Sequence, residues 1–163
     1  MSETVFINFR GGIIAPDTLY NIMVAIQRIR IPFVRFGLRQ QLLVELEPYH
    51  LEDFSASLTE LGISFTTNVN EQPNIISSSP AEDVFIQDTW LSETAYKDVL
   101  NAIDYNPMIT VNICDNNQSI TPMLTGNINW IAAAGTPHYW HLFIRFPRTN
   151  VVYEWDQLTA TKD

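Results

Sequence analysis

The sequence predicts an α+β protein made of two small lobes, and three observations support this. Patterns typical of strand, helix, strand, helix and strand follow one another within residues 5–66. Residues 67–80 then shift in composition to Asn, Gln, Pro and Ser, which is typical of a connection. Helix and strand patterns resume beyond that connection. We therefore expect a first domain over residues 1–70, with a sheet covered by helices on one side, packed on a second small α/β lobe over residues 71–163.

Local signals set the bounds of the helices in the first domain. Pro16 suits the first position of a helix, and Pro32 prevents that helix from continuing. Gly62 is a natural stop for a second helix over residues 51–61. Strands are expected at residues 5–9, 33–46 and 63–66.

The stretch over residues 34–46 alternates between apolar and polar side chains, which predicts one long strand with an apolar core face. The alternation weakens over residues 37–40, where a bend or bulge in this strand is expected. The opposite face would carry Arg35, Gly37, Arg39, Gln41 and Glu45. Two guanidiniums on either side of a bare glycine suit a small oxyanion or a ligand that carries carboxylates. The alternative is a half-buried sheet whose polar face meets only water.

The second lobe is predicted to contain a helix over residues 93–103, with Ser92 as its N-cap. The run over residues 115–119 is rich in turn-forming residues. Strands are expected at residues 73–77, 108–114, 127–132, 139–146 and 151–155.

Composition narrows the class of protein. The formal net charge of −9 over 163 residues argues against binding to nucleic acid, whose phosphates require a basic face. The first residues lack the features of a signal peptide, and no apolar stretch reaches membrane-spanning length, so we expect a soluble, cytoplasmic protein. The single cysteine, Cys114, rules out an intramolecular disulfide and any all-thiolate metal or iron–sulfur site within one chain.

The other sequence motifs favour structural roles. Gly11 and Gly12 follow a strand and precede a helix, but the rest of a nucleotide-binding fingerprint is missing, so a tight turn is expected. His138 and His141 lie three residues apart and would face opposite sides of a strand, which disfavours a shared metal ion. Cys114 has no neighbouring cation in the sequence and is expected to be a buried thiol.

Three segments together resemble the ferredoxin-like half-domain of nitrite and sulfite reductases. They are the run over residues 7–14, the helix opened by Pro16, and Val34-Arg35-Phe36-Gly37-Leu38-Arg39-Gln40. The last resembles the R-x-T-x-R-Q strand of that family, whose arginine helps to bind the substrate anion over sirohaem. Arg35 and Arg39-Gln40 match it, and Gly37 replaces the threonine. The resemblance covers residues 5–70 and implies a ferredoxin-like half-domain at the front of the chain.

Beyond residue 70 the resemblance is weaker. Asn74-Ile75-Ile76-Ser77 looks like the family's R-N-I/V segment, with Pro73 at the position of the arginine. Gly126-Asn127-Ile128-Asn129 stands for the family's P-R-K-F-K strand, with Asn127 and Asn129 at the lysine positions. Three of the family's four cationic contacts would therefore be missing, and the cysteines of its iron–sulfur cluster have no counterpart here.

The resemblance implies two alternative functions. The first is a redox-associated module of sirohaem-dependent nitrite or sulfite reductase origin, without activity of its own, in the front part of a longer, rubredoxin-type electron-transfer protein. The second is a non-catalytic module that binds a small anion or a protein partner. In both cases we expect no cofactor on the isolated chain, although sirohaem is implied by the resemblance, and we expect a homodimer or a partner redox domain. The candidate anion- or cofactor-binding residues are Arg35, Arg39, Gln41, Asn74, Asn127 and Asn129.

Overall fold

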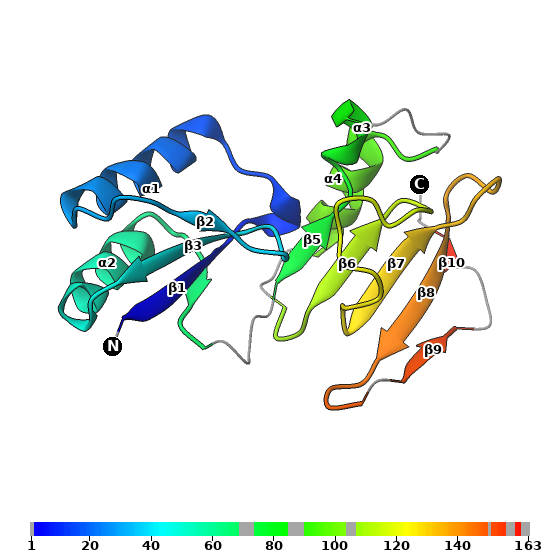
Figure 1. The fold of residues 1–163 in the computed structure, drawn as a ribbon. Coiled ribbons are helices and arrows are strands. Elements are labelled where there is room, and N and C mark those ends of the chain that lie inside the picture. Colours follow the sequence, from blue (N-terminus) through cyan, green and yellow to red (C-terminus); the bar gives the residue numbers. More distant parts are fainter. Residues whose placement is uncertain are drawn as a thin grey trace. The chain divides into compact units, whose positions relative to one another are not determined.

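The protein is described by a computed structural model, which covers residues 2–68, 74–84, 90–103, 107–149, 151–155 and 159–160. The chain divides into two compact units, Met1–Gln72 and Pro73–Asp163, and each is described by itself (Figure 1). The sequence suggests a boundary between residues 70 and 71. Pro73, which the resemblance aligns with a family arginine, lies outside the described residues.

The first unit has the order of elements of a ferredoxin-like fold, β-α-β-β-α-β. Its elements are β1 (Glu3–Asn8), the 3-10 helix η1 (Arg10–Gly12), α1 (Pro16–Arg28), β2 (Arg35–Phe36), β3 (Gln41–Leu46), α2 (Pro48–Glu60) and β4 (Phe65–Thr66). The strands form an antiparallel sheet in the order β2-β3-β1-β4 (Figure 1). The expected α+β class is thus confirmed for this unit.

The helices of the first unit cover one face of its sheet. The register pairs Val5 with Val44 and Ile7 with Leu42, so these four side chains share a face, and all are fully buried. The core cluster that they form with α1 and α2 also includes Ile22, Ile26, Leu46, Phe54 and Leu58. The predicted helix signals are confirmed here, because Pro16 opens α1 and Gly62 follows α2 with a left-handed φ of 68°. Burial of a continuous apolar face therefore stabilises the half-domain.

The predicted long strand over residues 33–46 is wrong, because the chain reverses in its middle. The amide of Gln40 donates to the carbonyl of Gly37 at 3.0 Å, and the amide of Gly37 donates to the carbonyl of Gln41 at 2.8 Å. These bonds close a three-residue hairpin loop with Gln40 in the left-handed region at φ 54°. Phe36 and Leu38, expected in the core, are 81% and 86% exposed. The alternation weakens at residues 37–40, where a bend or bulge was expected, but the chain reverses completely there. The left-handed position holds Gln instead of the usual Gly, so the residue types gave no signal for a hairpin turn.

The second unit is a mixed sheet with helices inserted between its first two strands. Its elements are β5 (Ile75–Ser77), α3 (Ala81–Val84), α4 (Glu93–Ala102), β6 (Val111–Cys114), β7 (Ile128–Ala132), β8 (Tyr139–Arg145), β9 (Val152–Glu154) and β10 (Thr159–Ala160). The strand order is β10-β8-β7-β6-β5, with β9 also paired to β8; β5, β6 and β7 are parallel, and the other pairings are antiparallel. The predicted cap of α4 is confirmed, because Ser92 Oγ accepts a hydrogen bond from the amide of Ala95.

The two faces of this second sheet differ in chemistry. One face packs on α4 through an apolar cluster that includes Val111, Ile113 and Trp140. On the other face, Asn112 of β6 reaches the connection over residues 115–127, where its Nδ2 donates to the carbonyl of Pro122 at 3.3 Å. That connection joins two parallel strands without a helix and holds three non-glycine residues in the left-handed region, Gln118, Ile120 and Leu124.

Within the described residues, no helix combines the length and the apolar character needed to cross a lipid bilayer.

Candidate functional site

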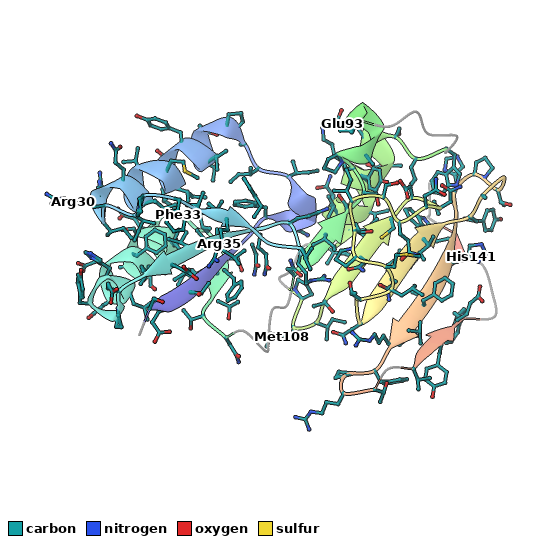
Figure 2. All side chains as sticks on the ribbon, in the orientation of Figure 1. Arg30, Phe33, Arg35, Glu93, Met108 and His141 are labelled. Carbon is teal, nitrogen blue, oxygen red and sulfur yellow. The ribbon has the colours of Figure 1, made fainter. Side chains whose placement is uncertain are left out.

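Arg35 lies on β2 and is engaged by a carboxylate on the neighbouring strand. Its guanidinium donates to Glu45 Oε1, and the two side chains are 53% and 40% exposed. Figure 2 labels Arg35 on this strand. Because β2 pairs Arg35 with Leu43 of β3, the side chains of Arg35 and Glu45 share the helix-free face of the sheet. The positive charge of Arg35, which was expected to bind an anion, is thus paired with the negative charge of Glu45. Glu45 was expected on this polar face, but its role as a partner depends on the hairpin, which the sequence did not reveal.

Arg39 lies in the turn of the hairpin, not on the strand that carries Arg35. It follows Gly37 and the exposed Leu38 and is half-buried. The two arginines therefore do not project from one face of one strand, which was the geometry expected from the alternation. Arg39 therefore belongs to the loop between β2 and β3, which places it away from the strand position that the alternation assigned to it.

The side chain of Gln41, the first residue of β3, forms a hydrogen bond between two strands of the sheet. It is 2% exposed, and its Nε2 donates to Asn8 Oδ1 at 2.8 Å. Asn8 is the last residue of β1 and lies directly opposite Gln41 in the register. This bond joins two adjacent strands at the end of the sheet where η1 begins, so Gln41 supports this end instead of presenting its amide to solvent.

The candidate asparagines of the second unit take part in an internal network. Asn129 is fully buried; its Oδ1 accepts from Asn112 Nδ2 at 2.9 Å and from the amide of Gly126 at 3.0 Å. Its Nδ2 donates to the carbonyl of Gly126 at 2.8 Å and, more weakly, to that of Phe143 at 3.4 Å. The side chain of Asn129 is thus satisfied by the fold itself.

Asn127 and Asn74 are also held inside the second unit. Asn127 Oδ1 accepts from the amide and the hydroxyl of Thr110 at 3.1 and 2.9 Å, and its Nδ2 donates to the carbonyl of Arg145 at 3.2 Å. Asn74 is 4% exposed, and its carbonyl accepts from the amide of Val111 at 2.8 Å. The six candidates therefore divide between the units, with Arg35, Arg39 and Gln41 in the first and Asn74, Asn127 and Asn129 in the second.

These residues do not fit sirohaem, a macrocycle whose many carboxylates require several cations. Arg35 is paired with Glu45, and the amide groups of Asn127 and Asn129 are used within the sheet. In the described part of the chain, no three His, Cys, Asp or Glu side chains are grouped to hold a metal ion. His141 instead pairs with Glu154 at 3.3 Å, and the ring of His138 lies 5.5 Å from that of Trp90.

A buried carboxylate that the sequence did not single out lies at the end of β6. Asp115 is fully buried, and its Oδ1 accepts from the amides of Asn117 and Ser119, both at 2.9 Å. Its Oδ2 has no hydrogen-bond partner in the described structure. Residues 115–119 were correctly predicted as a turn; the position of Asp115 directly after a buried parallel strand was the available signal for its burial.

The comparisons with known proteins support the fold. No family model and no curated protein matches the chain. The structure nevertheless defines a mixed α+β fold with a ferredoxin-like half-domain. A solved structure similar to it is that of the NirA protein of Mycobacterium tuberculosis, with a TM-score of 0.60 and 18% sequence identity. The match covers 86% of this chain but only 28% of NirA, so this chain spans less than a third of that protein.

Proposed function

We propose that this chain is a redox-associated module derived from sirohaem-dependent nitrite and sulfite reductases, without reductase activity of its own. The fold similarity to NirA supports the origin, and its 28% coverage of that protein agrees with a module that serves within a larger assembly. In this proposal the module belongs to the front part of a longer electron-transfer protein of the rubredoxin type.

The non-catalytic part of the proposal is supported by one observation: candidate binding residues interact with other residues of the chain. Arg35 is neutralised by Glu45, and Asn127 and Asn129 stand where the family has lysines and bond within the second sheet. A reduction by several electrons also needs an electron supply beside the substrate, and one cysteine cannot hold an iron–sulfur cluster.

The second candidate function is a binding module for a small anion or a protein partner. Arg39 at the tip of the hairpin favours it, because a single guanidinium can hold a small oxyanion, whereas it cannot neutralise a macrocycle with many carboxylates. In this alternative the inherited surface binds ligands but performs no chemistry.

Titration with sirohaem followed by a visible absorption spectrum distinguishes a non-catalytic module from a working reductase. We expect the isolated chain to stay colourless after desalting and to bind sulfate in a way that Arg39→Ala weakens. We expect the melting temperature to change little in that variant, and a loss of stability as large as the loss of binding would mean that Arg39 is structural. Retention of sirohaem with a strong visible band would overturn the non-catalytic proposal.

We also propose that the chain associates with a second copy or with a partner redox domain. Phe36 lies on the edge strand β2, Phe33 precedes that strand and Leu38 follows it. All three are exposed, and exposed apolar residues at a sheet edge are commonly covered by another chain. Light scattering at micromolar concentration tests the homodimer, and a monomeric mass would contradict it.

A further inference from the structure

The strand β2 is the last strand on one side of the first sheet, and within the described residues no strand pairs with its outer side (Figure 1). The amide of Gly37 donates to the carbonyl of Gln41 at 2.8 Å. Two residues earlier, Arg35 lies opposite Leu43 of the antiparallel β3. Hydrogen-bonded and non-bonded pairs alternate along an antiparallel ladder, so the backbone of Arg35 faces β3 and that of Phe36 faces away. The N–H and C=O groups of Phe36 therefore point toward the open edge.

The side chains beside these backbone groups are apolar and exposed. Phe36 is 81% exposed, although its pairing with Leu42 puts it on the face of the sheet that carries the helices. Phe33, which precedes the strand, is 62% exposed (Figure 2). An edge with unfilled backbone donors and acceptors and exposed aromatic rings is a template for pairing with another extended chain.

A second copy of β2 fits this edge in one symmetric register. Two identical antiparallel strands pair about a two-fold axis, at which one residue lies opposite itself. The strand consists of Arg35 and Phe36, so the axis lies at one of these two. At Arg35 the backbone groups face β3, and two like charges would stand directly opposite each other. At Phe36 the outward N–H and C=O groups of the two copies bond to one another.

The side chains on both faces are compatible with the register about Phe36. On the helix-free face, Arg35 of each copy lies across from the partner's Gly37, a residue without a side chain. The guanidinium is paired with Glu45 of its own copy, so the two arginines near the axis are not unpaired like charges. On the other face, the ring of Phe36 meets the partner's Phe36, and cross-strand aromatic pairs of this kind stabilise antiparallel sheets.

We infer that a second copy of this chain binds at the open edge of β2, by antiparallel pairing of the two β2 strands about Phe36. The two four-stranded sheets then form one continuous sheet. This inference rests on the proposed association with a second copy and specifies its geometry. The ladder is short because the chain turns over residues 37–40, so we expect a dimer with a Kd in the micromolar range.

Hydrogen exchange of the full, unchanged chain tests the edge directly. The Phe36 amide is the reporter, because pairing at the open edge protects it. We expect its exchange to slow by about tenfold as the protein concentration rises from low micromolar to millimolar, with sedimentation measured in parallel. The Gly37 amide is the internal control, since it is bonded to Gln41 within each copy. A dimer with an unprotected Phe36 amide would overturn the inference and leave the proposed association standing. A monomer throughout this range would overturn both.

Phe36→Pro tests the same hydrogen bond by removing its donor. An edge strand accepts proline where the N–H points outward, because no bond within the sheet is lost. We expect the Kd of the dimer to rise by about tenfold or more, and to rise less in Phe36→Ala, which keeps the amide. Tyr20→Ala removes an exposed ring from α1 and is the matched control. Equal Kd values for Phe36→Pro and Tyr20→Ala would overturn the inference.

A cysteine at position 36 tests the register, and it decides if Phe36→Pro does not fold. Residues of a hydrogen-bonded antiparallel pair have Cα atoms about 5.5 Å apart, which a disulfide can span. The natural Cys114 is buried and does not compete. We expect oxidised Phe36→Cys to form a covalent dimer about tenfold faster than Tyr20→Cys. Equal rates in the two variants would overturn the register about Phe36.

Discussion

The two units use polar side chains in opposite ways. In the first unit, Arg35 and Glu45 form an ion pair on an open face of the sheet, with both side chains roughly half exposed. In the second, Asn112 and Asn129 are fully buried and satisfy one another and the backbone around Gly126. Water can replace the first interaction at little cost, whereas nothing replaces the second. The stability of the fold should therefore depend on the uncharged network and hardly on the ion pair.

The largest expected effect is that of Asn129→Ala. The substitution leaves Asn112 Nδ2 and the amide of Gly126 buried with fewer partners, so we expect a loss of about 2–3 kcal/mol in the free energy of unfolding. All four tryptophans, at positions 90, 130, 140 and 155, belong to the second unit, so urea denaturation followed by tryptophan fluorescence reports on it selectively. The exposed Asn116→Ala is the control and should change stability by less than about 0.5 kcal/mol. Equal effects of the two variants would contradict the importance of the network.

A smaller effect is expected from Gln41→Ala in the first unit. The variant loses the 2.8 Å hydrogen bond from a buried amide to Asn8, which should cost about 1–1.5 kcal/mol. Because no tryptophan lies in this unit, hydrogen exchange of the β1 and β3 amides is the suitable measurement. Gln27→Ala on the exposed side of α1 serves as the control. Unchanged exchange in Gln41→Ala would mean that this amide does not hold the strands together.

The ion pair should contribute less than either amide. A double-mutant cycle of Arg35→Ala and Glu45→Ala is expected to give a coupling energy of about 0.2–1 kcal/mol, which decreases at high salt. A coupling above about 2 kcal/mol would mean that the pair is far better shielded from water than its exposure indicates, and the comparison between the units would fail.

The smallest effect concerns Glu93, at the start of α4. A hydrogen bond from Lys97 and the charge of its ammonium hold the pKa of Glu93 below its ordinary value of 4.5. A carboxyl group whose pKa is lowered by folding stabilises the folded protein at pH values above its ordinary pKa. This contribution is lost as the pH falls through the lowered pKa. An NMR titration of the Glu93 carboxyl should show the shift, and Lys97→Ala should remove it. A shift that survives in Lys97→Ala would assign it to another cause.

Local chemistry was readable from the sequence, but the meeting of distant segments was not. Pro16, Gly62 and Ser92 act within one turn of their own helices, so their roles could be predicted. The hairpin in place of the long strand was missed because Gln40 adopts a conformation that glycine usually signals. The same error placed Arg35 and Arg39 on one face.

The prediction of the candidate site was the least accurate, because it depended on contacts between distant segments. The pairing of Arg35 with Glu45 depends on the register of two strands, and the internal bonds of Asn127 depend on Thr110 and Arg145, far along the chain. A single sequence contains no record of these contacts, so side chains expected to bind a ligand proved to be bound to the protein.

The connection between β6 and β7 contains a position at which the stability of the protein could be increased. Ile120 is 44% exposed and has a φ of 62°, a conformation that is especially costly for a branched side chain. Glycine at this position would relax the backbone with little loss of apolar burial, at the expense of a more flexible unfolded chain. A more stable variant of this protein can therefore be obtained by a substitution in one surface segment, without a change in the core contacts.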